Sequence, residues 1–257
     1  MKAALLVNGA AGRMGRLVAA HLRRAGFADV AGCDTAAQGS LALEDGPLPL
    51  VESLVAGLEP RGVVVDFSHP GATPALVEAA RACGARLVVG TTGQSEAEME
   101  LLREAATSVP VVLARNFSLG VQRIAQALAK FRIMTREGFD VELIEAHHAG
   151  KRDAPSGTAF YLLESLLGQE PPAGIVHGRF GPEARRGHGE VGVHSVRAGG
   201  FPGEHTLLLA SADEVVEIRH RALSRAAFVS GVPPAVRFVQ HHPPGLYSLL
   251  DVMGDAP

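Results

Sequence analysis

The segment from Glu145 to Thr158 concentrates side chains that can move protons and hold anions. It contains two adjacent imidazoles, His147 and His148, followed by the ammonium group of Lys151. An imidazole exchanges a proton near neutral pH, and an ammonium group can neutralise or protonate a bound substrate. These residue types in one short segment predict acid–base chemistry on an anionic substrate.

The end of this segment, Ser156-Gly157-Thr158, stands where a helix is expected to begin. Hydroxyls and free N–H groups at a helix N-terminus suit a carboxylate. His147 and His148 are adjacent at the end of an expected strand, so their side chains point to opposite sides. We therefore expect the two histidines to have separate roles.

Other interpretations of the segment stay open. Ser156 can be only a helix N-cap, and Lys151 can be only a solvated charge. A zinc site is a further alternative, but adjacent histidines lack the i, i+4 spacing of helical zinc ligands, and no cysteine lies nearby. The sequence therefore predicts no metal site.

A second motif, Gly9-Ala10-Ala11-Gly12-Arg13-Met14-Gly15, lies between a short aliphatic run and a helical pattern. Glycines there permit a tight turn and a close backbone approach, and a helix N-terminus attracts a pyrophosphate. Asp34 ends the next expected strand, 19 residues after Gly15, where a carboxylate can accept hydrogen bonds from a ribose. The spacing predicts dinucleotide binding, although an ordinary tight turn capped by Asp34 is the alternative.

The choice between NADH and NADPH follows from charge. Asp34 would repel a 2′-phosphate and Thr35 offers no positive charge, so NADH is favoured unless Arg13 or Arg16 compensates. Ligands of open parallel sheets gather beyond the carboxyl ends of the strands. That rule nominates further cofactor loops at Phe67-Ser68, Gly90-Thr91-Thr92-Gly93 and Ala114-Arg115-Asn116-Phe117.

The first half of the chain alternates strands with helices. Strands are expected at residues 3–7, 30–34, 62–68, 86–89 and 109–114, and helices at 13–24, 72–83 and 96–106. The last helix opens with a capping box, Ser95 and Glu98. Valine-rich strands without polar alternation indicate a parallel sheet covered on both faces. The fold class is therefore α/β, with a doubly wound sheet.

The pattern changes beyond a helix near residues 121–131. A strand is expected at 139–147, a helix at 158–167, and strands at 191–198, 205–210 and 215–220. Glycine-rich turns between the last strands favour an antiparallel or mixed sheet, so a second, α+β domain is expected to begin near Leu119. A final helix over residues 224–241 should kink or break at Pro233-Pro234. The strand at 191–198 is a candidate edge, open to another subunit or covered.

Composition excludes several classes of protein. A chain of 257 residues is long enough for two modest domains, and a net charge of −3 provides no cationic field for nucleic acid. The N-terminal apolar run is too short for a signal peptide, and no stretch is long enough to span a membrane. Cys33 and Cys83 lack metal spacing, and two free thiols suit a reducing compartment, so we expect a cytoplasmic protein.

Over nearly its whole length the sequence resembles the dihydrodipicolinate reductase family, the NAD(P)H-dependent enzymes of the diaminopimelate route to lysine. The most specific match is Glu145-Ala-His-His148 followed by Lys151 and Asp153-Ala-Pro-Ser-Gly-Thr-Ala159. The other matching segments are Gly9-Ala-Ala-Gly-Arg-Met-Gly-Arg16, Val65-Asp-Phe-Ser68, Val89-Gly-Thr-Thr-Gly93, Asn116-Phe-Ser118, Val196-Arg-Ala-Gly199 and Gly203-Glu-His-Thr206.

The resemblance implies a Rossmann domain, residues 1–118 plus 229–257, and an inserted mixed-sheet domain, residues 119–228, that binds substrate and builds a homotetramer. It implies that His147 is the catalytic acid/base and that Lys151 donates a proton or contacts a carboxylate. His148, Ser156 and the backbone of Gly157 and Thr158 would bind the substrate carboxylate. The implied cofactor residues are Gly9 to Met14, Asp34, Gly90 to Thr92 and Ala114 to Phe117.

The implied reaction is hydride transfer from the nicotinamide to C4 of a cyclic imine dicarboxylate, followed by protonation of the resulting enamine to tetrahydrodipicolinate. The substrate can be the hydroxylated ring or its dehydrated form. Three positions depart from the family pattern: Ala11, Thr35 and Val232-Pro-Pro234. Two alternative functions are another nicotinamide-dependent reductase, such as an amino-acid or semialdehyde dehydrogenase, and an NADH sensor without turnover.

Overall fold

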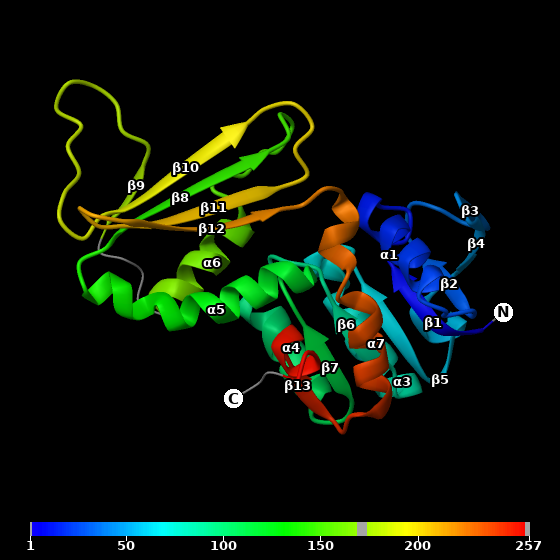
Figure 1. Ribbon diagram of the computed structural model, residues 1–257. Coiled ribbons are helices and arrows are strands. Elements are labelled where there is room, and N and C mark those ends of the chain that lie inside the picture. The colour runs from blue at the N-terminus through cyan, green and yellow to red at the C-terminus, as the bar shows by residue number, and fades with distance from the viewer. Residues whose placement is uncertain (1, 169–173, 255–257) are drawn as a thin grey trace. The chain divides into compact units, whose positions relative to one another are not determined.

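Residues 2–168 and 174–254 are described by a computed structural model (Figure 1). The chain divides into two units: unit 1 comprises residues 1–118 and 228–257, and unit 2 comprises residues 119–227. Within the described part of the chain, no helix is both long and apolar enough to cross a membrane.

Unit 1 is built around an eight-stranded sheet with the order β13-β7-β6-β5-β1-β2-β4-β3. All neighbouring strands pair in parallel except β3 and β4, which form an antiparallel pair. The strands are β1 (Ala3–Asn8), β2 (Val30–Cys33), β3 (Ser40–Leu43), β4 (Gly46–Val51), β5 (Leu58–Asp66), β6 (Arg86–Val89), β7 (Pro110–Leu113) and β13 (Gly245–Tyr247). This sheet confirms the predicted α/β class.

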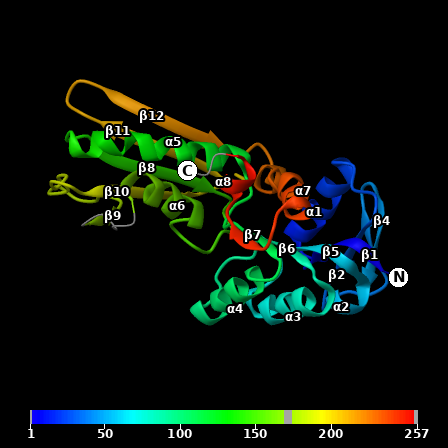
Figure 2. The same cartoon turned by 90° about the horizontal axis from the view of Figure 1, so that it is seen from below.

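Helices cover both faces of this sheet (Figure 2). One face packs against α1 (Arg13–Arg24) and α7 (Val232–His241), and the other packs against α2 (Leu54–Gly57), α3 (Thr73–Cys83) and α4 (Glu96–Ala106). The central strands are aliphatic on both sides, and Val63, Val64 and Val65 are all buried. A strand covered on both faces must be apolar throughout, which explains the continuous valine runs.

The helix boundaries follow from local chemistry. The predicted capping box of α4 is confirmed: the Ser95 hydroxyl accepts the Glu98 N–H, and the Glu98 carboxylate accepts the Ser95 N–H. Gly84 ends α3 in the left-handed region, at φ 64°, where glycine carries no Cβ penalty. The predicted bounds of α1, α4 and β6 agree with the structure.

The expected break in the helix over residues 224–241 is confirmed, but it lies before Pro233-Pro234 and not at them. The chain forms a short 3₁₀ helix, η2 (Arg225–Val229), and α7 starts separately at Val232 after its N-cap Gly231. Pro233 and Pro234 do not kink a helix interior, because they occupy its first turn. Backbone N–H groups in the first turn have no partner within the helix, so proline is tolerated there.

Unit 2 contains a five-stranded mixed sheet with the order β12-β11-β8-β10-β9. Its strands are β8 (Asp140–His147), β9 (Ile175–His177), β10 (Val191–Arg197), β11 (Glu204–Ala210) and β12 (Val215–Arg221). Two helices, α5 (Leu119–Arg136) and α6 (Gly157–Leu167), pack on one face only (Figure 1). Buried residues alternate along β8 and β11 accordingly, as expected for a sheet with one covered face.

The candidate edge strand at residues 191–198 is not an edge. β10 pairs in parallel with β8 along its whole length, and β9 covers its other side at Val191–Val193. Within the described residues, the edges of this sheet are β12 and β9. β9 could not be predicted from the sequence, because a three-residue strand is too short to show a period.

Other short elements were not predicted for the same reason, namely α2, β13, α8 (Leu249–Val252) and the 3₁₀ helix η1 (Pro70–Ala72). The hairpin of β3 and β4 was also missed, because Pro47 and Pro49 argue against a strand from sequence.

Candidate functional site

In unit 1, the glycine-rich loop joins the end of β1 to the start of α1. Gly9 has φ 76°, and a Cβ there would lie 2.6 Å from the carbonyl oxygen of Phe67. A Cβ on Gly15 would collide with the carbonyl group of Gly9. Glycine at these two positions is therefore required by backbone conformation and by close packing, as the motif predicts.

The start of α1 offers a fit for a pyrophosphate. Gly12 is the N-cap, in extended conformation, and no side chain caps the helix. The first-turn amides of Arg13 and Met14 therefore donate no hydrogen bond to a capping side chain. Gly12 is exposed and has no side chain, so a ligand can approach the backbone closely. Unsatisfied N–H groups and the helix dipole favour an anion here, so the residues present fit a dinucleotide.

Asp34 follows β2 directly and lies beside this loop. Its Oδ2 accepts the Ala11 N–H at 2.8 Å, and its Oδ1 accepts the Ala36 N–H at 2.8 Å. Asp34 therefore does cap the turn, as the alternative interpretation holds. Each carboxylate oxygen has two lone pairs, so both retain an acceptor site for a ribose hydroxyl.

The other nominated loops lie at the same edge of the sheet, beyond the carboxyl ends of β5, β6 and β7. The Ser68 N–H donates to Thr91 Oγ1 at 2.9 Å, and the rings of Phe67 and Phe117 lie 5.6 Å apart. Gly90 packs so tightly on the Phe67 ring that a Cβ would overlap it. The structure therefore places Gly90 to Thr92 and Ala114 to Phe117 beside the switch point between β1 and β5.

A buried polar cluster at this edge was not predicted. The Asn8 side chain donates to Asp66 Oδ1 at 2.8 Å and to Ser68 Oγ at 3.1 Å, and Ser68 Oγ donates to the same Asp66 oxygen at 2.5 Å. Asp66 is only 1% exposed. The cluster fixes the ends of β1 and β5 against each other, because each buried polar atom has a hydrogen-bond partner.

In unit 2, the acid–base segment connects the end of β8 to the start of α6. His147 is the last residue of β8 and is buried on the face that α6 covers, whereas His148 lies beyond the strand and is partly exposed. The two histidines thus have different surroundings. The segment is held by hydrogen bonds from the Lys151 N–H to the His148 carbonyl and from the Ala149 N–H to the Gly199 carbonyl.

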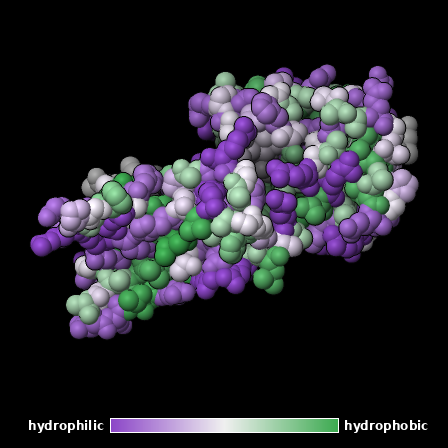
Figure 3. Space-filling view, turned by 90° about the horizontal axis from the view of Figure 1, so that it is seen from above, coloured by the Kyte–Doolittle hydropathy of each residue, from purple (hydrophilic) through white to green (hydrophobic). Residues whose placement is uncertain are grey.

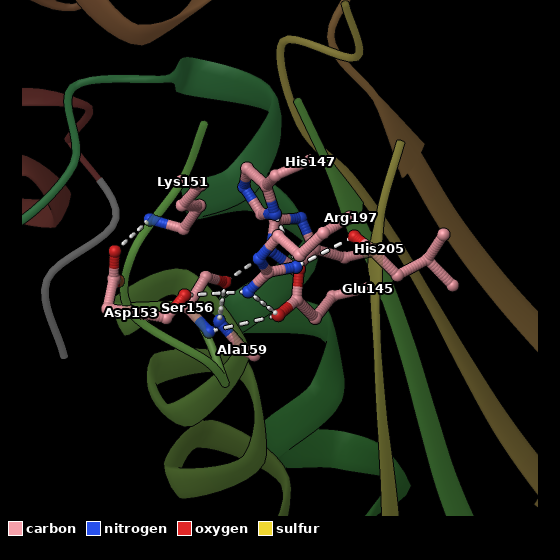
Figure 4. A network of polar contacts seen from close by, with 9 residues as sticks. Glu145, His147, Lys151, Asp153, Ser156, Ala159, Arg197 and His205 are labelled. Atoms are coloured by element: carbon pink, nitrogen blue, oxygen red, sulfur yellow. Dashed lines mark hydrogen bonds and ion pairs between the residues drawn. The ribbon is translucent and has the colours of Figure 1, made fainter. Parts of the chain in front are cut away.

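Glu145 is the centre of the polar network in Figure 4. Its carboxylate accepts two bonds from Arg197, at 2.7 Å to Oε1 and 2.9 Å to Oε2. Oε2 also contacts His147 Nδ1 at 2.5 Å, and Oε1 accepts the Ser156 N–H at 3.2 Å. The side chain of Glu145 is completely buried.

The Glu145 carboxyl is ionised despite its burial. Burial opposes the charge and alone would raise the pKa, but hydrogen bonds from His147, Arg197 and Ser195 outweigh it. The pKa of Glu145 therefore lies well below its ordinary value. A bidentate guanidinium contact of this kind also fixes the plane of the carboxylate.

Ser156 and His205 complete this network. The Ser156 hydroxyl accepts the Ala159 N–H at 3.1 Å, which makes it the N-cap of α6, and it lies 2.9 Å from His205 Nε2. The His205 and His147 rings meet edge to face at 5.3 Å. Burial, followed by the nearby charge of His147, lowers the pKa of His205 to about 3, so His205 is neutral at physiological pH.

Lys151 is not a free charge, because its Nζ lies 2.9 Å from Asp153 Oδ1. Burial opposes the charge of Asp153, but the hydrogen bond from Lys151 outweighs it and lowers the pKa of Asp153. Gly157 and Thr158 form the first turn of α6, and the Ser156 hydroxyl caps this helix by accepting the Ala159 N–H. The positive end of the helix dipole at this turn favours an anionic group.

Sequence reasoning named His147, His148, Lys151 and the start of α6, and the structure brings them into one segment. It missed Glu145, Arg197 and His205. A signal existed, because Glu145 lies two residues before His147, and side chains two apart in a strand share a face. Arg197 and His205 lie more than 50 residues further along the chain, so only strand pairing brings them to Glu145.

A doubly wound parallel sheet with a glycine loop at its switch point, joined to a unit carrying an acid–base cluster, defines the class of dinucleotide-dependent reductases. Comparison with protein families narrows this class. Residues 3–117 match the model described as dihydrodipicolinate reductase, N-terminus, and residues 120–253 match dihydrodipicolinate reductase, C-terminus. The chain belongs to the dihydrodipicolinate reductase family, whose members are NAD(P)H-dependent reductases.

Relatives cover nearly the whole chain. It is 37% identical to a 4-hydroxy-tetrahydrodipicolinate reductase of Alkalilimnicola ehrlichii, over 99% of this chain and 100% of the relative. Another reductase of this name, from Thermomicrobium roseum, is 44% identical over 80% of this chain and 81% of the relative. The fold matches a dipicolinate-bound dihydrodipicolinate reductase from Paenisporosarcina sp. TG-14, with a TM-score of 0.70 and 22% identity over 98% of this chain and 99% of that one.

Proposed function

We propose that this protein reduces 4-hydroxy-tetrahydrodipicolinate, or its dehydrated form, to tetrahydrodipicolinate with NADH or NADPH, in the diaminopimelate route to lysine. The activity is that of its near full-length relatives. The observation that carries the proposal is the cluster at the end of β8, where His147, Lys151 and the start of α6 lie in one segment. An imidazole and an ammonium group beside a helix start suit a substrate that carries two carboxylates and whose ring must receive a proton.

We propose that unit 1 holds the dinucleotide. Its pyrophosphate would bind the uncapped start of α1, and its ribose would bind the Asp34 carboxylate. The contacting residues would be Gly9, Ala10, Ala11, Gly12, Arg13, Met14, Asp34, Gly90, Thr91, Thr92, Ala114, Arg115, Asn116 and Phe117. When bound, the reduced nicotinamide supplies the hydride.

NADH is the preferred cofactor in this proposal. Asp34 opposes a 2′-phosphate, whereas Arg16 uses Nε and Nη1 to bind the carbonyls of Ala11 and Ala42 and can offer a 2′-phosphate only its remaining N–H groups. Arg13 is exposed at the start of α1 and could offer compensation, so NADPH remains a second, weaker cofactor.

Unit 2 is the substrate-binding unit in this proposal. The amides of Gly157 and Thr158, with Ser156 at the cap of α6, would bind one substrate carboxylate. His148 would contact the same carboxylate, and Lys151 would neutralise charge on the ring or give a proton to it. Lys151 would exchange its contact with Asp153 for a contact with substrate, since both are ion pairs of a partly buried ammonium.

His147 is the proposed acid. Loss of water from the hydroxylated ring gives the α,β-unsaturated imine, and hydride addition at its C4 leaves an enamine, which needs one proton to give the product. His147 lies at the end of β8 with one ring nitrogen bonded to Glu145, so the other nitrogen is left for the substrate. An imidazole placed in this way can give the proton to the enamine and take a proton back from solvent.

The proposed assembly is a homotetramer in the cytoplasm. The face of the unit 2 sheet opposite α5 and α6 carries exposed apolar side chains, among them Ile144, Val196 and Val215. Figure 3 looks onto this face and shows hydrophobic residues gathered along it. A sheet face of this kind suits burial against other subunits. Cys33 and Cys83 are both free thiols, in keeping with a reducing compartment.

The first experiment follows NADH and, separately, NADPH oxidation optically after the protein meets the freshly made condensation product of pyruvate and aspartate semialdehyde. We expect oxidation that depends on this substrate, faster with NADH. A reaction without the condensation product is the control. Absence of turnover from protein that binds NADH would refute the assigned substrate and favour another reductase or a sensor.

A further inference from the structure

The carboxylate of Glu145 is surrounded by hydrogen-bond donors. Arg197 reaches both oxygens, the Ser156 N–H reaches Oε1, and His147 Nδ1 reaches Oε2 (Figure 4). An ionised carboxylate only accepts hydrogen bonds. The His147 nitrogen that faces it must therefore carry a hydrogen, which places the proton of neutral His147 on Nδ1 and leaves the lone pair on Nε2.

Arg197 makes this arrangement rigid. Its two Nη atoms bind the two oxygens of Glu145 in parallel, and one of them also donates to the Asp153 carbonyl at 2.7 Å. The guanidinium thus fixes the plane of the carboxylate and ties it to the loop that precedes α6. It also balances a charge that is completely buried, which an unpaired carboxylate could not tolerate.

His205 closes the other side of His147 without adding a charge. Ser156 Oγ accepts the Ala159 N–H and lies 2.9 Å from His205 Nε2, so the hydroxyl and this ring nitrogen share a hydrogen bond. The edge-to-face contact with His147 keeps the two rings at 5.3 Å. His147 is therefore fixed by a carboxylate at one nitrogen and by a neutral ring at its side.

We propose that Glu145 and Arg197 form a positioning pair that holds the proton of His147 on Nδ1 and presents Nε2 as the atom that exchanges a proton with substrate. This inference rests on the proposed role of His147 in the reaction. A carboxylate that fixes the tautomer of a catalytic histidine is an established device, and replacing it by an amide reverses the tautomer.

The test variant is Glu145→Gln. Glutamine has only one carbonyl oxygen. This oxygen should occupy the Oε1 position, because both Arg197 Nη2 and the Ser156 N–H donate there. The amide NH₂ then faces His147 Nδ1 and donates to it, which moves the histidine proton to Nε2. We expect kcat to fall about 10²- to 10⁴-fold, while the KM for NADH stays within about twofold, as expected when only the chemical step is impaired.

The matched control is Glu190→Gln. Glu190 also lies in unit 2 and also binds an arginine, Arg179 at 3.0 Å, but it contacts no histidine in the described structure. Glu190→Gln removes the same unit of negative charge as Glu145→Gln but does not affect His147, so kcat should be unchanged. A comparable loss of kcat in both variants would show that the effect is one of charge or stability, and would overturn the positioning role.

The tautomer itself is measured by ¹⁵N NMR of the imidazoles, at a pH high enough to remove the imidazolium signals. The protein has eleven histidines, and the His147 signals are identified by their loss in His147→Gln. We expect Nδ1–H in the wild-type protein and Nε2–H in Glu145→Gln. Nε2–H in the wild-type protein would overturn the inference even if the variant does not fold.

This measurement needs no substrate, so it separates the two proposals. Absence of turnover in the wild-type protein would refute the proposed function, whereas the wild-type tautomer decides the inference independently. An unchanged Nδ1–H tautomer in a folded Glu145→Gln would also overturn it, because the carboxylate would then not determine the proton position.

Discussion

Replacing Asp34 by asparagine should reverse the preference between the two nicotinamide dinucleotides. Asp34 accepts the N–H groups of Ala11 and Ala36, each at 2.8 Å, and its remaining lone pairs are placed for a ribose. Asparagine has one acceptor oxygen, so one of these two amides faces an NH₂ group. Leaving that amide without a partner costs about 1 kcal/mol of folding free energy.

The loss of NADH affinity follows from the charge of the acceptor. A hydrogen bond to a charged group contributes about 1.5–3 kcal/mol, against about 0.5–1.5 kcal/mol for a neutral pair. A ribose hydroxyl that donates to Asp34 therefore loses about 1–2 kcal/mol in Asp34→Asn. The KM for NADH should rise about 5- to 30-fold, if binding equilibrates before hydride transfer.

The effect on NADPH has the opposite sign. For an assumed separation of about 5 Å between a 2′-phosphate and the carboxylate, the repulsion per unit charge is about 1–3 kcal/mol for effective dielectric constants between 80 and 20. Because Asp34 is partly exposed, the lower half of this range applies. Removing the charge should improve kcat/KM for NADPH about 5- to 30-fold.

The assay compares kcat/KM for both cofactors at saturating imine substrate, in wild type, Asp34→Asn and the control Asp45→Asn. Asp45 lies in the same unit and pairs with Arg23 at 3.5 Å, away from the glycine loop, so its loss should leave the cofactor ratio unchanged. Thermal unfolding of each variant measures the stability cost separately. A folded Asp34→Asn with the wild-type cofactor ratio would refute the reasoning and leave Asp34 as a turn cap only.

Three further changes test other parts of the structure. Gly15→Ala places a Cβ against the Gly9 carbonyl, so it should lower stability by about 1–3 kcal/mol and weaken NADH binding; an unchanged Tm would contradict this packing. Lys151→Ala should reduce kcat far more than it alters the Kd for NADH, whereas the exposed Lys130→Ala should change neither; equal losses in turnover and NADH binding would argue against its role. Because the pKa of His205 falls to about 3 on folding from about 6.5 in the unfolded chain, the unfolded state binds more protons between these values. Stability should therefore decrease as pH falls from about 6.5 toward 3, by up to about 1.4 kcal/mol per pH unit; in His205→Gln the slope of denaturant-measured stability against pH should be smaller, and an equal slope would contradict the assignment.

Much of the fold could be predicted because its signals are local. The valine runs at Val63–Val65 and the capping box of Ser95 and Glu98 act within a few residues, so they specify strand and helix before any tertiary contact forms. The start of the helix at Val232 could not be predicted from local signals. Pro233-Pro234 signals a break, but whether proline ends one helix or begins another depends on where the chain must turn.

The candidate site also contains both residues that local motifs identify and residues that they do not. Residue types and their spacing identified the glycine loop, Asp34, His147 and Lys151. Each of these lies in a short motif whose chemistry depends on neighbours in the chain. Their partners could not be identified from spacing. Lys151 was expected to be either a proton donor or a solvated charge, and the structure pairs it with Asp153, a contact that either interpretation allows.

Residue types and local spacing are enough to identify the groups that can do chemistry and the elements that carry them: imidazole at a strand end, hydroxyl and amides at a helix start, glycines before a helix. Which nitrogen of His147 faces a carboxylate depends instead on how distant strands pair. β8 pairs in parallel with β10 and antiparallel with β11, which brings Arg197 and His205 to Glu145 across more than 50 residues of chain. Strand register is set by the burial of whole sheet faces, so no local motif can specify it.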